Sequence, residues 1–184
     1  MLAFRALKVR DRTPETRRDK IAPKKEDSMA HSAQGIAIFA PLIIALPTTL
    51  GTIVIHGVAV IAIVHFVHHQ RRLGRAGIRF WRDVLIVSGA TLLALMAHLV
   101  EIVIWALVFA LCGEFTHLAP AVYHSAVNYT SLGYGDVVMS ASWRLLGPLE
   151  TADGMLMFGV STAMIFAVIQ RLVQTRFNFE DDPS

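Results

Sequence analysis

The sequence predicts an all-α membrane protein with three transmembrane helices and one shorter helix that enters the membrane and returns. Three observations support this prediction. Of the 184 residues, 54% are hydrophobic and 17% are charged, whereas soluble domains are roughly a quarter charged. Apolar runs long enough to cross a membrane recur along the chain. A glycine-containing stretch, YTSLGYGD at 129–136, lies between the last two of these runs.

The N-terminal segment, residues 1–35, is expected to be a polar, disordered extension. Residues 1–28 carry charges of both signs and prolines, and they show little apolar periodicity. They also lack the short apolar core and small-residue cleavage site of a signal peptide. An alternative is that translation of the natural protein begins at Met29.

The first transmembrane segment is expected over residues 36–69, which contain no Asp, Glu, Lys or Arg. This run is too long for one untilted span and too short for two, since each span needs about 20 residues. Pro41 and Pro47 are expected to break its first part, because proline removes a helical donor and clashes with the preceding turn. We therefore expect the full span at 44–68, preceded by an interfacial lead-in.

The linker at 70–83 indicates the orientation of the chain. It contains five arginines, whereas residues 113–153 contain one arginine and four acidic residues. Because basic residues concentrate in cytoplasmic loops, we expect the linker inside and the glycine-containing stretch outside. Three spans then put the N-terminus outside, which disagrees with the basic character of residues 1–28. The arginines suit anionic lipid headgroups, and nothing in the linker requires nucleic acid. They are Arg71, Arg72, Arg75, Arg79 and Arg82.

The rest of the chain, residues 84–173, is expected to form one domain followed by a short cytoplasmic tail at 174–184. The apolar runs at 84–113 and 147–173 are long enough to span. Between them HLAPAVYHSAVNYT, residues 117–130, is about a dozen residues long and too short to cross. A short helix that returns as extended chain is expected there, since irregular backbone at membrane depth must be buried in protein or line water.

The glycine-containing stretch has the residues needed to bind a dehydrated cation. In an extended chain successive carbonyls alternate in direction, and left-handed φ at Gly133 and Gly135 would let them point the same way. Leu132 and Tyr134 are expected to point backward and pack on the short helix. Stacked carbonyls, together with the hydroxyl of Ser131, would replace the water of a cation. The predicted binding segment is Ser131, Leu132, Gly133, Tyr134, Gly135 and Asp136, with Asp136 at the outer edge.

The motif TSLGYGD resembles the selectivity filter of the tetrameric pore-loop potassium channels, whose usual form is TVGYGD. The resemblance covers residues 84–173, and HLVEIVIWAL and WRLLGPLE are similar to small prokaryotic ion-channel-family proteins. It implies a homotetramer that surrounds potassium ions with backbone oxygens and conducts them passively without catalysing a reaction. Ser131 replaces the usual threonine and Leu132 the usual valine. The resemblance therefore implies conduction of potassium, or of monovalent cations with weak selectivity.

The same resemblance assigns roles to residues on both sides of the filter. Inner-helix glycines occur at Gly154 and Gly159, the first at the usual place of a gating hinge. On the same helix Thr162 would be the hydrophilic position of the cavity and Phe166 an apolar constriction. For Met155, Phe158 and Phe166 plain helix packing is the alternative. The expected filter-supporting residues are Tyr123, His124, Asn128 and Thr130.

Ionisable residues within the spans need partners, because a charge at the bilayer centre is costly. Glu101 lies three residues after His98 and shares its helix face, and His56 of the first span is a second candidate partner. The group is either a pH-responsive brace or polar contacts that fix helix packing. Glu150 and Asp153 are expected to support the filter or a subunit boundary.

Two other functions remain open from the sequence. One is a membrane b-type haem protein, which would use two transmembrane histidines as axial ligands but leaves the glycine-containing stretch unexplained. The other is a non-conducting, channel-like sensor subunit. His65, His68 and His69 share one face and form either a metal or proton site or an interfacial cluster. In the haem alternative, the axial ligands would come from His56, His65, His69 and His98.

The expected location of the protein is the plasma membrane of a prokaryote.

Overall fold

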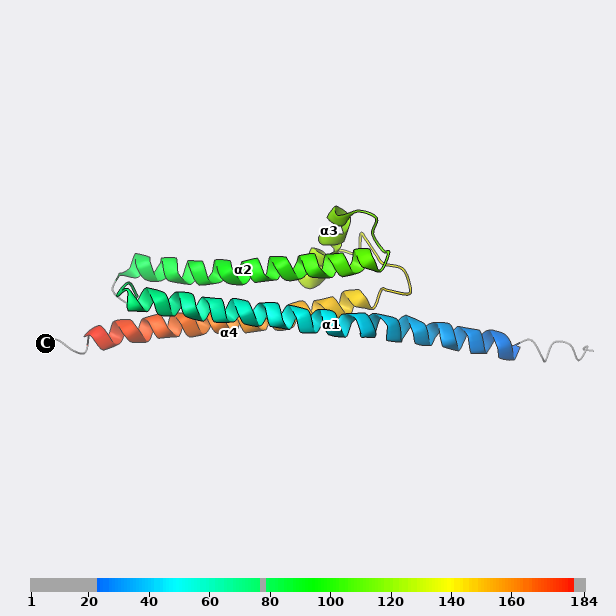
Figure 1. Ribbon diagram of the computed structural model, residues 1–184, viewed down its shortest axis with the longest axis horizontal. Helices are drawn as coiled ribbons and strands as arrows, with labels where there is room; N and C mark the ends of the chain where they lie inside the picture. The colour runs from blue at the N-terminus through cyan, green and yellow to red at the C-terminus, as the bar shows by residue number, and fades with distance from the viewer. Residues whose placement is uncertain (1–22, 77–78, 181–184) are drawn as a thin grey trace, which may run out of the picture. The chain divides into compact units, whose positions relative to one another are not determined.

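The computed structural model describes residues 23–76 and 79–180, and this part of the chain is helical without strands. Three of its helices contain segments long and apolar enough to cross a membrane: Ile38–Arg72, Phe80–Leu111 and Leu146–Arg176. The predicted all-α fold with three spans is therefore confirmed. The four helices are α1 (Pro23–Arg72), α2 (Phe80–Leu111), α3 (Leu118–Tyr129) and α4 (Leu146–Glu180) (Figure 1).

The chain forms two units, residues 1–35 and 36–184. In the first unit, residues 23–35 belong to α1, which differs from the disordered extension expected there. The segment PKKEDSMAHSAQG explains the difference, since Lys, Glu, Ala, Met and Gln are good helix formers. The expectation for residues 1–22 lies outside the described residues.

The two prolines of α1 do not break the helix, so the predicted break is wrong. Pro41 and Pro47 both lie inside α1, and the apolar segment begins at Ile38. Each proline removes one helical donor, a loss that neighbouring helices and local adjustment can offset in membrane proteins. Pro41 is also fully buried. Its ring therefore adds packing area at the place where a donor is lost.

Within residues 36–184, α1, α2 and α4 lie side by side (Figure 1). Two apolar clusters hold them together. One surrounds Trp105, Phe109 and Leu146 near α3. The other surrounds Ile63 and Leu172 near the opposite ends of the spans. Many large apolar side chains remain on the outside of this unit, as expected for helices that face lipid.

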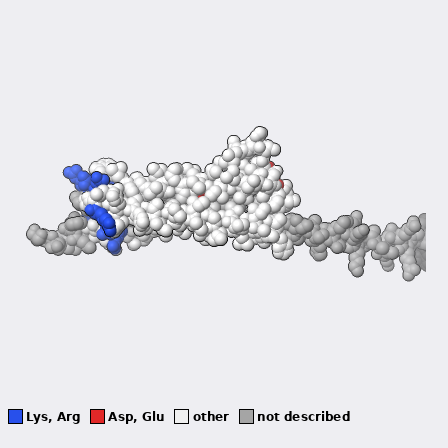
Figure 2. Space-filling model, viewed as in Figure 1, with Lys and Arg blue, Asp and Glu red and all other residues white. Residues whose placement is uncertain are grey.

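The linker between α1 and α2 covers residues 73–79, because the helices extend further into it than expected. Arginines gather at this end of the spans (Figure 2). Arg176 of α4 lies 3.8 Å from Asp83 of α2 at the same end. The last helix continues to Glu180, so much of the predicted tail at 174–184 is helical.

Candidate functional site

The glycine-containing stretch begins where α3 ends. The N–H of Ser131 donates to the carbonyl of Asn128 at 2.9 Å, and the N–H of Leu132 donates to that of Val127 at 2.9 Å. This is the Schellman pattern, which places one residue in the left-handed region. Here that residue is Ser131, with φ of 57°. For a side chain other than glycine this conformation costs about 1–2 kcal/mol. The surrounding structure must therefore impose it.

Left-handed residues then alternate along the stretch. Ser131, Gly133 and Gly135 have φ of 57°, 58° and 71°, whereas Leu132 and Tyr134 between them have negative φ. The conformation predicted for the two glycines is confirmed. The sequence analysis missed Ser131 as a third left-handed position. An alternating backbone of this kind can present successive carbonyl oxygens on one side, which is what a cation filter needs.

Leu132 and Tyr134 do not pack on α3, contrary to the prediction. Their side chains are 54% and 67% exposed. The buried positions of α3 instead include Ser125 and Tyr129, which contact α2 and α4. Within the described part of the single chain, all residues from 131 to 136 are exposed.

The four predicted support residues act at different places. Tyr123 reaches the stretch directly, and its hydroxyl donates to Oδ2 of Asp136 at 2.7 Å. His124 and Asn128 pair with each other through Nε2 and Nδ2 at 2.9 Å. Burial lowers the pKa of His124. Its imidazole is therefore neutral near pH 7 and can accept this hydrogen bond. Thr130 donates its hydroxyl to a carbonyl of α3.

Glu150 and Asp153 of α4 lie buried against the other helices. The Ser125 hydroxyl lies 2.5 Å from Oε1 of Glu150, and Oδ2 of Asp153 accepts hydrogen bonds from Thr52 at 2.8 Å and Trp105 at 2.9 Å. These contacts join α1, α2, α3 and α4. The expectation that the two acids support the filter region agrees with this position. A residue at a subunit boundary would be exposed in the single chain, whereas Glu150 and Asp153 are both buried.

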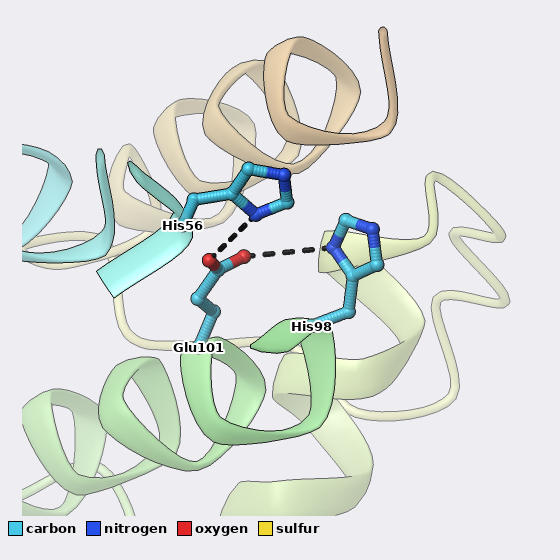
Figure 3. A group of neighbouring side chains, drawn as sticks. All are labelled: His56, His98 and Glu101. Atoms are coloured by element: carbon cyan, nitrogen blue, oxygen red, sulfur yellow. Dashed lines mark hydrogen bonds and ion pairs between the residues drawn. The ribbon is translucent and has the colours of Figure 1, made fainter. Parts of the chain in front are cut away.

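The predicted intramembrane pair forms part of a larger buried cluster. Nδ1 of His56 lies 2.9 Å from Oε1 of Glu101, and Nδ1 of His98 lies 3.5 Å from Oε2 (Figure 3). Tyr129 donates its hydroxyl to Glu101. The hydroxyl of Ser161 lies 3.0 Å from Nε2 of His98 and 3.1 Å from Nε2 of His56. The sequence analysis missed Tyr129 and Ser161, because only the fold brings them to Glu101.

The inner-helix glycines occupy different environments. A Cβ on Gly154 would lie 2.3 Å from the carbonyl oxygen of Tyr129, so this glycine allows α4 to approach α3. The helix α4 is continuous there, and the role of Gly154 as a hinge stays a prediction. A Cβ on Gly159 would meet nothing within 4 Å. Thr162 and Phe166 are exposed, so no described residue of the chain covers this face of α4.

The histidines do not form a haem site in the part of the chain that the structure describes. The rings of His56 and His98 lie 5.1 Å apart and both nitrogens of each have close partners, which leaves no room for a macrocycle between them. His65 and His69 are exposed and lie near the C-terminal end of α1. Among the described residues, the group that could hold a metal is His56, His98 and Glu101.

Comparison with known proteins gives one family. A family model described as an ion channel matches residues 97–171, which is less than half of the chain. The matched part begins just before His98 and includes α3, the glycine-containing stretch and most of α4. No curated protein and no solved structure matches. The family match supports ion-channel activity, and with the three apolar helices it indicates an integral membrane protein.

Proposed function

We propose that this chain is the pore-forming subunit of a homotetrameric channel that passively conducts potassium, or monovalent cations with weak selectivity. The observation that carries the proposal is the alternating backbone of residues 131–135, which starts directly at the end of a short helix. A left-handed φ is costly for Ser131, which is not a glycine. The alternation is useful where successive carbonyl oxygens must point to the same side. Potassium ions would bind to these oxygens, and no organic cofactor is needed.

Assembly of four chains follows from what one chain leaves open. A single filter segment encloses nothing, and a ring of oxygens requires cyclic symmetry. Leu132 and Tyr134 are exposed in the single chain and would find their packing partners in a neighbouring copy. The uncovered face of α4 at Gly159, Thr162 and Phe166 would then line the cavity below the filter.

The arginine-rich end of the spans favours an inside position for the α1–α2 linker and an outside position for the filter (Figure 2). The arginines would contact anionic lipid headgroups there. The plasma membrane of a prokaryote remains the proposed location, as the resemblance to small prokaryotic channel proteins implies. Asp136, tied to Tyr123 at the outer end of the filter, would raise the local concentration of cations.

Potassium flux into liposomes reconstituted with the purified chain tests conduction. Gly133→Ala should abolish the flux, because the added methyl group disfavours the left-handed angle that the filter backbone needs. Gly74→Ala is the matched control. Gly74 has φ of 61° and open space around it, so the variant carries a similar backbone penalty in the linker. Equal flux from the Gly133 variant and the wild type would refute the proposal.

The same preparation separates the alternatives. A monomeric protein in detergent and lipid nanodiscs would exclude the tetrameric pore. A well-folded tetramer without flux above empty vesicles would favour the non-conducting subunit. Reversal potentials with potassium on one side and sodium on the other then decide between strong and weak selectivity, and Ser131→Thr and Leu132→Val test the two replaced filter residues.

A further inference from the structure

The buried cluster behind the filter has the donors of a metal site. His56 of α1, His98 of α2 and Glu101 of α2 are 3%, 5% and 0% exposed. One ligand atom from each lies within 4.8 Å of the other two. The carboxylate of Glu101 lies between the two imidazoles, and Nδ1 of each ring points toward it (Figure 3). Two imidazoles and one carboxylate are ligands that zinc accepts readily.

The distances suit four-coordinate metal binding. Metal bonds of about 2.0–2.2 Å to nitrogen and oxygen place neighbouring donor atoms of a tetrahedral site roughly 3.3 Å apart. Nδ1 of His56 lies 2.9 Å from Oε1 of Glu101 and Nδ1 of His98 lies 3.5 Å from Oε2, so each imidazole faces its own carboxylate oxygen at a distance close to that value. The hydroxyl of Tyr129 lies 3.0 Å from Nδ1 of His98 and donates to Glu101, so it borders the site without being one of the three protein ligands.

The outer partners also fit. An imidazole that binds a metal through Nδ1 carries its hydrogen on Nε2 and needs an acceptor for it. Both Nε2 atoms, of His56 and of His98, converge on the hydroxyl oxygen of Ser161 at 3.1 and 3.0 Å. This oxygen has two lone pairs and can accept both hydrogens. A ligating carboxylate is usually hydrogen-bonded as well, and Tyr129 donates to Glu101.

With both imidazoles neutral and Glu101 ionised, the hydrogen count of the cluster does not close. Five close contacts link the five side chains in a ring, and each contact needs one hydrogen. Two neutral imidazoles, two hydroxyl groups and an ionised carboxylate supply one hydrogen fewer than this. The ring therefore needs one further positive charge. Among the described residues, neither Lys nor Arg bonds to this ring, and the carboxylates of Glu150 and Asp153 are buried nearby.

We propose that Nδ1 of His56, Nδ1 of His98 and the carboxylate of Glu101 bind one divalent transition-metal ion of the zinc class. The ion supplies the missing charge and joins α1 to α2 within the membrane. Tyr129 links this site to the filter, since it bonds to Glu101 and lies two residues before Ser131. The metal site can be tested independently of conduction, because its metal content can be measured in a protein that carries no current.

The test is the zinc content of the full-length protein, purified in detergent, loaded with zinc chloride, and freed of loosely bound metal by gel filtration. Elemental analysis should find about one zinc per chain, and X-ray absorption should show a shell of nitrogen and oxygen without sulfur. The double variant His98→Gln/Glu101→Gln should lose the metal. The control is His65→Gln, which replaces an exposed histidine of α1 outside the site. This variant should keep the zinc.

A second variant tests the site with a smaller risk of unfolding the protein. Ser161→Ala keeps all three ligands and removes their shared outer partner, so zinc should bind about 10–100-fold more weakly. The proposal is overturned if the folded wild type binds no stoichiometric zinc, in which case a proton supplies the missing charge. It is also overturned if the double variant, eluting as the wild type does, retains the metal. A purely structural role for Ser161 would leave zinc affinity unchanged.

Discussion

Gly154→Ala tests how the packing of α4 on the end of α3 supports the proposed filter. The new Cβ would lie 2.3 Å from the carbonyl oxygen of Tyr129 and 3.1 Å from its carbonyl carbon. Carbon and oxygen atoms in contact are normally about 3.3–3.6 Å apart, so α4 and the end of α3 must separate by about 1 Å. The obstacle is backbone, which cannot swing aside as a flexible side chain would.

The expected magnitude follows from two opposing terms. Overpacking of this kind costs typically 1–3 kcal/mol. Alanine gains up to about 1 kcal/mol over glycine in a helix interior. We expect a net loss of about 1–2 kcal/mol in the free energy of unfolding, which is a fall of several degrees in Tm for a chain of this size. Because Tyr129 precedes the proposed filter, potassium flux should fall as well.

Thermal unfolding of the detergent-solubilised protein, followed by circular dichroism and by loss of the monodisperse gel-filtration peak, measures this effect. Gly57→Ala of α1 is the control, since a Cβ there meets nothing within 4 Å. It should leave Tm unchanged or raise it slightly through helix propensity. A Gly154 variant as stable as the Gly57 variant would refute the argument that close approach to Tyr129 requires the glycine.

Two further predictions concern α3. Tyr123→Phe removes the hydrogen bond to Asp136. With potassium opposite sodium, the reversal potential should move toward zero while Tm changes little, since the bond is exposed; an unchanged potential would show that the bond does not hold the filter. His124 has a lowered pKa, because burial disfavours its charged form. The unfolded chain therefore binds the proton more tightly, and stability should fall as pH drops below about 6.5. Melting curves at several pH values should show a smaller acid loss for His124→Gln than for the wild type, whereas His117→Gln should keep the wild-type loss.

The spans could be predicted because their signal is local. Length and hydropathy alone locate three membrane-spanning segments, and glycine spacing predicts left-handed residues at Gly133 and Gly135. The break at the prolines was wrong because the rule for proline describes an isolated helix. In a membrane bundle, the burial of Pro41 and contacts with neighbouring helices offset a lost donor. Ser131 was missed for the opposite reason, since the end of α3 imposes its φ and its own side chain does not favour it.

The buried cluster shows the limit of spacing arguments. His98 and Glu101 share a face by helical periodicity, so the sequence brings them together. Ser161 lies on another helix and is separated from His56 by 105 residues, and no sequence pattern reports that contact. Leu132 and Tyr134 show a different limit. We predicted that their side chains pack on α3 of their own chain. The buried residues of α3 contact α2 and α4 instead.

Tyr129 is the residue at which these contacts meet. Its hydroxyl is bonded to Glu101 of α2, its carbonyl faces Gly154 of α4, and Ser131 begins the alternating backbone two residues later. A 12-residue helix is marginal by itself, so its position depends on packing against its neighbours. The left-handed φ of Ser131 is costly and persists only if the surroundings fix both sides of it. These buried polar contacts thus do more than offset buried charge, because they fix the end of α3 from which the backbone of the proposed filter starts.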